Sequence, residues 1–368
     1  MGARTRPDKV AEPSRNRQGD GMVHRHRVQD IAVQAGLSQA TVDRVLNDRG
    51  GVRASTTAQV HRAVAELDRQ QTQLTVDGRS FLVDVVVDAP RRFSDAVRAA
   101  LEAELPALRP AVVRSRFSFT EAAPPAELAR HLARVAARGS HGVVLKAPDT
   151  PEVADAVARV QAAGIPVVTL VTDLPATGRL AYVGLDNRAA GATAAYLLSH
   201  WLGHQEDPAV LVVRGDAAFR GEDEREMGLR SVLRGGTRPR TPALVELVHR
   251  SGEDATLQRA VGDVLDGHPG LSAVYSMYGF GGNAAVLAAF GARRRPCDVF
   301  VTHDLHEENR ELLLAGRLSA VLHHDLDEDM RRCCQLIMQA QGALPGPVVS
   351  VPSTIQVITP HNVPVRRR

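Results

Sequence analysis

The sequence is poor in the residues that mark disulfide-rich, metal-binding or membrane proteins. Among its 368 residues are three cysteines, Cys297 and the adjacent Cys333 and Cys334, and only 4% aromatic residues. An odd number of cysteines without a CxxC spacing argues against a disulfide framework or a zinc site, so reduced thiols are expected. The longest apolar runs, 81–87 and 209–213, are far shorter than the roughly 20 residues that span a bilayer. We therefore expect neither a membrane segment nor a metal site.

The N-terminal residues contain no apolar segment suited to a signal peptide, so we expect the protein to stay in the cytoplasm. Residues 1–25 are charged, rich in Gly and Pro and aperiodic, and we interpret them as a disordered leader. Charge is uneven, because residues 1–79 hold 13 Lys or Arg against 9 Asp or Glu in a chain of net charge +3. A positive excess confined to one end favours a polyanionic partner such as DNA.

A compact all-α module is expected at residues 26–70. Apolar residues recur at helical spacing in three short stretches, Gly36 ends the first of them, and Ser38 can cap the second. Three short helices within about 45 residues are typical of a helix-turn-helix domain. The polar stretch 71–79 is predicted to be the linker or hinge that follows it.

From residue 80 onward strand and helix patterns alternate, which is typical of parallel sheets. About nine such units exceed what one doubly wound sheet usually holds. We therefore predict an α/β core of two Rossmann-like lobes at 80–364, with a cleft between them. Lobe 1 is expected to contain about 80–186 and 304–325, and lobe 2 about 187–300 and 326–364. The expected strands are 81–88, 112–118, 142–146, 166–170, 210–214, 244–249, 273–277, 298–302 and 320–323.

Residues 28–47 carry a long and specific motif. A short Ala35-Gly36 turn is followed by the Ser38 cap and by the pattern Thr-Val-x-Arg-Val-Leu-Asn, which ends at Asn47. This segment resembles the DNA-binding head of the lactose-repressor (LacI/GalR) family. Independently of the resemblance, a tight Gly turn sets two helices so that the second can enter a major groove about 12 Å wide.

The second helix of this motif presents side chains suited to reading base edges. Gln39 can form paired hydrogen bonds with adenine, Arg44 is suited to guanine, and Ala40 can pack against a thymine methyl group. Other polar side chains near the helix starts are expected to contact the DNA and to fix its register on the protein. These further expected DNA contacts are Arg27, Ser38, Thr41, Asn47 and Thr56.

The resemblance implies a transcription regulator, expected to be a repressor, that binds double-stranded, pseudo-palindromic operator DNA as a homodimer. Two features depart from the family pattern. Asp43 places an acid beside the DNA backbone, where it should repel phosphate. Residues 68–74 lack the usual hinge-helix motif and leave Leu74 as the one side chain placed to wedge open the minor groove.

Residues 81–364 resemble the family's sugar-sensing core, which is similar to periplasmic ribose-type binding proteins. The stretches 182–191, 219–229 and 302–304 carry this resemblance. Sugar sites combine Asp, Arg and Asn at strand ends with an aromatic ring against the sugar. The resemblance implies a small carbohydrate-like effector. The expected effector contacts are Asp173, Arg225, Asp304 and His324, with Phe93, Phe219 and Tyr278 as stacking surfaces.

Other interpretations of these residues remain. Arg225 and Asp304 can instead form a structural ion pair, and either Phe93 or Phe219 can be simple core. The run 279–284 imitates a G-x-G-x-x-A dinucleotide fingerprint, which would indicate a nucleotide-dependent enzyme, but it lies late in the chain and lacks a suitable acid about 20 residues on. A solute-binding protein would share the core without a DNA head. We expect a regulator that is not an enzyme and needs no cofactor.

Overall fold

The structure is a computed structural model, and it describes residues 26–76, 78–216, 219–235, 241–249, 254–277 and 282–365, without the side chains of 71–76. It divides into two units, Met1–Leu74 and Thr75–Arg368. The expected leader at 1–25 lies outside the described residues. Within the described residues, every helix is too short or too polar to cross a membrane.

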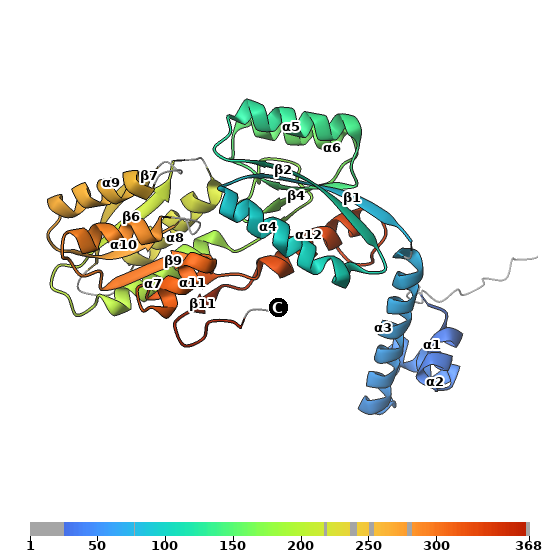
Figure 1. Cartoon of the computed structure of the whole chain (residues 1–368). Helices are drawn as coiled ribbons and strands as arrows, with labels where there is room; N and C mark the ends of the chain where they lie inside the picture. Colours follow the sequence, from blue (N-terminus) through green and yellow to red (C-terminus); the bar gives the residue numbers. More distant parts are fainter. Residues whose placement is uncertain are drawn as a thin grey trace, which may run out of the picture. The chain divides into compact units, whose positions relative to one another are not determined.

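The N-terminal unit, the head, consists of α1 (Val28–Ala35), α2 (Gln39–Leu46) and α3 (Ala54–Val76) (Figure 1). Gly36 ends α1 with a φ of 63°, a left-handed conformation that glycine adopts without a Cβ clash. Ser38 caps α2, because its Oγ accepts a hydrogen bond from the Thr41 amide at 3.2 Å. The buried core of the three helices consists of Ile31, Ala32, Ala35, Val42, Val60 and Ala63. The predicted three-helix module is confirmed.

The third helix is longer than expected. α3 continues to Val76 and so contains most of the segment that was predicted to be a linker. Polar residues such as Gln and Arg have good helix propensity, and the chain offers no Gly or Pro between Ala54 and Gly78 to stop the helix. The boundary between the two units still falls inside the segment 71–79, so its role as a linker or hinge stays a prediction.

Lobe 1 of the C-terminal unit, the core, is built on a five-stranded parallel sheet in the order β2-β1-β3-β4-β5. Helices α4, α5, α6 and α12 and a short 3-10 helix, η1 (Leu105–Leu108), pack against this sheet (Figure 1). The strands are β1 (Ser80–Asp88), β2 (Val112–Thr120), β3 (Gly142–Lys146), β4 (Val167–Leu170) and β5 (Ala181–Val183), and the helices α4 (Arg91–Glu104), α5 (Pro125–Arg138), α6 (Pro151–Ala162) and α12 (Leu326–Ala340).

Lobe 2 is built on a six-stranded sheet in the order β11-β10-β9-β8-β6-β7, in which only the edge strand β11 is antiparallel. The strands are β6 (Ala209–Gly215), β7 (Ala243–His249), β8 (Leu271–Ser276), β9 (Val299–His303), β10 (Ala320–His323) and β11 (Gln356–Ile358). The helices are α7 (Asn187–Trp201), α8 (Arg220–Gly235), α9 (Asp254–Gly267), α10 (Asn283–Ala292) and α11 (Glu307–Leu314). The predicted two-lobed α/β core is confirmed.

The division of the chain between the lobes differs from the expected one in two segments. β10 pairs with β9 and β11, so it belongs to lobe 2, whereas α12 packs on α4 and β4 of lobe 1. The chain therefore crosses between the lobes three times, at 184–186, at 324–325 and between α12 and β11. The error has a physical reason, since buried parallel strands have similar sequences and only tertiary packing decides which sheet each one joins.

Two helices of lobe 2 pack unusually close together. A Cβ atom on Gly191 of α7 would lie 1.9 Å from the Arg225 carbonyl oxygen, and one on Gly228 of α8 would lie 2.0 Å from that of Arg188. Only glycine allows the two backbones to approach in this way. The contact fixes α8, and with it Arg225, against α7.

Candidate DNA-reading face and ligand cavity

The side chains predicted to contact DNA lie on the surface of the head. Gln39, Ala40 and Arg44 are exposed on α2, whereas Val42 of the same helix is fully buried. α2 thus turns an apolar side to the core and a polar side to the solvent, as base reading requires. Of the other expected contacts, Arg27 and Ser38 are exposed, and Thr41, Asn47 and Thr56 are half-buried.

Asp43 does not present a bare carboxylate to the DNA. Arg49 donates a hydrogen bond to its Oδ2 at 2.9 Å, and the Asn47 side chain donates to its Oδ1 at 2.7 Å and to its carbonyl oxygen at 3.0 Å. The positive charge of Arg49 reduces the expected repulsion of phosphate. The same bonds use both N–H groups of the Asn47 amide, so this side chain has no donor left for the phosphate contact predicted for it.

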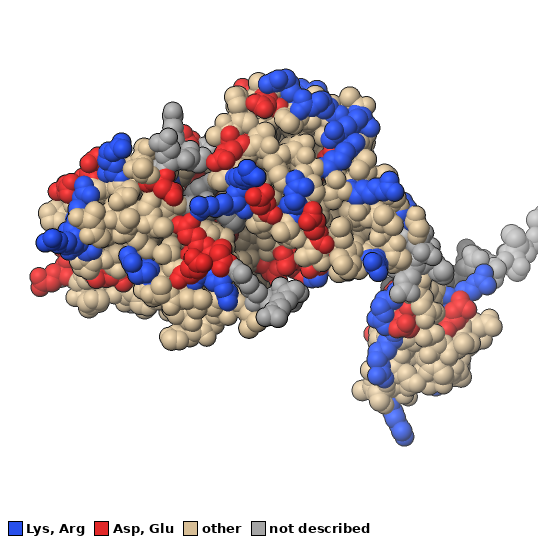
Figure 2. Space-filling view, in the orientation of Figure 1, with Lys and Arg blue, Asp and Glu red and all other residues tan. Residues whose placement is uncertain are grey.

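The head also carries a row of basic side chains. Figure 2 shows basic side chains, here all Arg, along α3, where Arg53 precedes the helix and Arg62 and Arg69 are exposed on it. Arg69 forms an ion pair with Glu66 of the same helix. Exposed arginines of this kind supply sequence-independent attraction to the DNA backbone. The side chain of Leu74, the expected minor-groove wedge, is not among those described.

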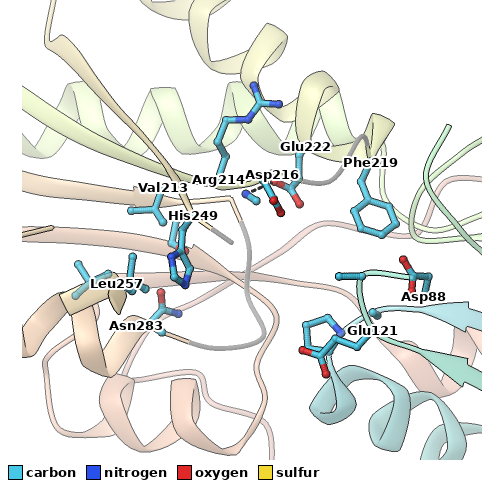
Figure 3. A pocket seen from close by; sticks show the side chains of 17 residues that line it. Asp88, Glu121, Val213, Arg214, Asp216, Phe219, Glu222, His249, Leu257 and Asn283 are labelled. Carbon is cyan, nitrogen blue, oxygen red and sulfur yellow. Dashed lines mark hydrogen bonds between the residues drawn. The ribbon is translucent and has the colours of Figure 1, made fainter. Parts of the chain in front are cut away.

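A cavity lies in the core between the two lobes, at the carboxyl ends of their strands. It has two parts, which share Ala89, Pro90, Phe219 and Glu222. The Lys146 pocket, with about 460 Å³ of empty space, is also lined by Phe93, Arg225 and Asp304. The Asn283 pocket, with about 630 Å³, is also lined by Asp88, Glu121, Asp216, His249 and Asn283 (Figure 3).

Arg225 is held rigidly in the wall of the Lys146 pocket. Its Nε donates to the Asn187 side chain at 2.9 Å, and its Nη1 donates to the Met277 carbonyl oxygen at 2.6 Å. Asn187 is itself anchored, since its Nδ2 donates to the Val171 carbonyl oxygen at 3.0 Å. Arg225 is therefore bonded to an amide and a carbonyl, and the alternative of a structural ion pair with Asp304 does not describe its contacts.

Asp304 is positioned by a histidine that was itself expected to contact the ligand. His324 Nε2 lies 3.5 Å from Asp304 Oδ1, and its Nδ1 lies 2.5 Å from Asp329 Oδ2. Burial alone would lower the pKa of His324, but the hydrogen bonds to the two carboxylates raise it to about 9. The hydrogen bond to His324 lowers the pKa of Asp304 in spite of burial. His324 thus contacts Asp304 and is not among the residues that line the two pockets, and its predicted contact with the ligand stays a prediction.

Asp173 also lies outside the cavity wall. Its carboxylate accepts hydrogen bonds at 2.8 Å from the Thr169 hydroxyl and the Leu174 amide, and it pairs with Arg179. Burial would raise the pKa of Asp173, but these hydrogen bonds, that of Arg179 first, lower it. Its acceptors are used in shaping the loop after β4, and the predicted ligand contact of this residue stays a prediction. Tyr278 lies outside the described residues, as do 279–281 of the expected fingerprint.

Sequence reasoning missed a lysine in the cavity. Lys146 Nζ lies 3.7 Å from the ring centroid of Phe219 and 5.4 Å from that of Phe93, a cation–π arrangement. It donates to the Asp88 carbonyl oxygen at 3.3 Å, and burial lowers its pKa to about 8. A signal was present, because Lys146 is the only lysine after Lys9 in a chain whose other basic side chains are arginines.

Glu222 and Asn283 were missed as well. The Glu222 carboxylate accepts from the Gly215 amide at 2.7 Å, and burial raises its pKa. Asn283 begins α10 and is 1% exposed. Glu222 lies in the stretch 219–229 that resembles a sugar-sensing core, so a signal for it was present, whereas Asn283 lies outside those stretches and only the fold brings it to the cavity. Within the described part of the chain, no group of three or more His, Cys, Asp or Glu side chains is arranged to hold a metal ion.

Comparisons with known proteins match both parts of the chain. The model of bacterial regulatory proteins of the lacI family matches residues 27–69, and that of the periplasmic binding protein domain matches residues 85–343. No curated protein matches the sequence significantly.

Solved structures share the fold of the core at low identity. GanP, a glucose-galactose binding protein from Geobacillus stearothermophilus, is 20% identical, with a TM-score of 0.68 over 78% of this chain and 100% of its own. A solute binding protein of an ABC transporter from Burkholderia graminis, in complex with D-arabinose, is 20% identical, with a TM-score of 0.67 over 78% and 97%. A protein from Bacteroides fragilis described as a LacI transcriptional regulator is 14% identical, with a TM-score of 0.67 over 77% and 98%.

Proposed function

Because this chain belongs to the LacI/GalR type of regulators, we propose that it represses transcription from a pseudo-palindromic operator under the control of a small sugar-like ligand. One observation carries the proposal: the same chain has an exposed polar face on α2 and a cavity between the two lobes of its core. The protein acts by binding inside the cell, as a homodimer whose two heads read two half-sites.

Operator reading depends on Gln39 and Arg44. Both side chains are exposed next to the Ser38 cap, and each bidentate contact to a base contributes about 1–3 kcal/mol of discrimination. Selection of genomic fragments by the full chain, followed by competition at rising salt, should yield one pseudo-palindromic sequence. Gln39→Ala with Arg44→Ala should reduce its affinity to that of random DNA, whereas Gln29→Ala, an exposed position on α1, should not. Binding without sequence preference in the unaltered protein would refute operator reading.

Ligand control depends on the Lys146 pocket. Phe93 and Phe219 offer aromatic surface, and Arg225 and Asp304 offer a fixed donor and a fixed acceptor, as sugar hydroxyls require. Relatives with this fold include a glucose-galactose binding protein and a structure with bound D-arabinose. A ligand that changes operator affinity a hundredfold must favour one of two protein states by about 2.7 kcal/mol.

The ligand is found by thermal-shift screening of pentoses, hexoses and cyclitols against the full chain. Arg225→Ala should abolish the stabilisation by any hit, because the guanidinium lies in the cavity wall. A reporter gene behind the selected operator then decides the direction of control, and activation of that reporter would overturn the repressor role. Saturable binding of NAD would favour the enzyme alternative instead.

A further inference from the structure

The Asn283 pocket is bounded by carboxylates from both lobes. Asp88 and Glu121 come from lobe 1 and Glu222 from lobe 2, and Figure 3 shows them on different sides of the cavity. Among the described residues, none of these three carboxylates forms an ion pair. By contrast, the buried carboxylate of Asp84, elsewhere in the core, forms ion pairs with both Arg116 and Arg138.

Among the described residues, the basic side chains near this pocket form no ion pair with these three carboxylates. Arg214 points away from the cavity in Figure 3, because Asp223 and Glu226 hold its guanidinium at 2.9 and 2.6 Å. His249 lines the pocket, but burial lowers its pKa, so its ring is mostly neutral at pH 7. Lys146 and Arg225 line the other pocket. Their charges act on Glu222, and that of Lys146 acts on Asp88 as well, but among the described residues neither basic side chain forms an ion pair with Asp88, Glu121 or Glu222.

An independent observation points to a ligand in the same place. The Oδ1 atom of Asn283 is buried and has no hydrogen-bond partner in the described residues. The orientation of the amide follows from its neighbours, because Asn309 donates to the carbonyl oxygens of His303 and Asp304 and so accepts from Asn283 Nδ2 at 2.7 Å. A buried acceptor without a partner is costly, and a donor on a bound molecule would satisfy it.

We propose that the Asn283 pocket binds the protonated amino group of an amino sugar or a similar amino polyol. This inference rests on the proposed function and names the class of its ligand. An ammonium group has three donors and a positive charge, which match an orphan acceptor surrounded by carboxylates from both lobes. Because these carboxylates come from both lobes, an ammonium group bound between them also favours closure of the lobes around it. The sugar ring then lies against Phe219, which lines both pockets.

The test is calorimetric titration of the full chain with three matched pairs of probes at pH 7. The pairs are D-galactosamine with D-galactose, D-glucosamine with D-glucose, and D-mannosamine with D-mannose, and each N-acetylated amine and D-glucuronate serve as uncharged and anionic controls. We expect at least one amine to bind tenfold or more tightly than its parent sugar and its N-acetylated form, with a preference that falls as salt is added.

Variants localise the preference. Glu222→Gln should reduce the preference for the amine at least threefold. Glu121→Gln provides the same test at an exposed position that does not bear on folding. Glu152→Gln on α6, an exposed glutamate outside the cavity, should leave the preference unchanged. Equal or tighter binding of a neutral sugar or of glucuronate overturns the amino-group proposal and leaves the sugar-like ligand standing. Binding of none of these probes overturns the amino-group proposal, and the proposed sugar-like ligand falls with it only if the thermal-shift screen of pentoses, hexoses and cyclitols also yields no hit.

Discussion

Replacing His324 with Gln removes a buried positive charge from between two carboxylates. His324 has an ordinary pKa of 6.5, and Asp304 and Asp329 raise it to about 9 in the folded protein. Since the folded pKa is the higher one, the stabilisation is fully present below pH 6.5 and is lost as the pH rises through 9. At about 1.4 kcal/mol per pH unit it amounts to about 3 kcal/mol, of which about 2 kcal/mol disappear between pH 6.5 and 8.

The measurement is urea unfolding of the wild-type protein, His324→Gln and the exposed control His361→Gln at pH 6.5 and 8. We expect His324→Gln to be about 3 kcal/mol less stable than wild type at pH 6.5 and only about 1 kcal/mol less stable at pH 8. The control should follow wild type at both values. The range stops at pH 8 because the lowered pKa of Lys146 gives the opposite slope above it. A deficit that is the same at both values would show that His324 carries no charge in the fold.

Three further predictions concern single contacts. Gly228→Ala should cost about 1–3 kcal/mol and weaken ligand binding, because its Cβ would force α8 away from α7, whereas Gly235→Ala, which meets open space, should leave the melting temperature unchanged. Ser38→Ala should weaken the start of α2 by about 1 kcal/mol, seen as several-fold faster hydrogen exchange of nearby amides, and unchanged exchange would rule out the cap. Lys146→Met should raise the free energy of unfolding at pH 7, measured with urea, by up to about 3 kcal/mol, and it should abolish ligand binding. The reason is that the pKa of about 8 reflects a cost of burying the charged amine, which is present below pH 8 and vanishes above pH 10.5. A destabilised variant would contradict this.

The alternation of strands and helices in the core could be predicted because each strand is a short run of β-branched and apolar residues between turn signals. β5 and β11 were missed, since three residues are too few to show a pattern. The lobes to which β10 and α12 belong could not be predicted. The sequence of a buried strand does not indicate which sheet it joins, and that of a helix does not indicate which sheet it packs against.

The candidate site was predictable where residue type alone indicates chemistry. Arg225, Asp304 and Phe219 do line the cavity. Asp173 has the same chemical type but its acceptors are used by its own loop, which sequence cannot reveal. Asn283 became visible only through the hydrogen bonds that leave one of its atoms without a partner.

The three crossings between the lobes also affect how the protein is made. α12 supplies Met330, Cys333 and Ile337 to the apolar interior of lobe 1, yet it emerges from the ribosome after nearly all of lobe 2. The nascent first lobe therefore exposes an uncovered apolar sheet face until synthesis is almost finished, and a chain truncated before Leu326 should aggregate. Neither lobe is one continuous piece of sequence, so neither can be obtained by trimming an end of the gene.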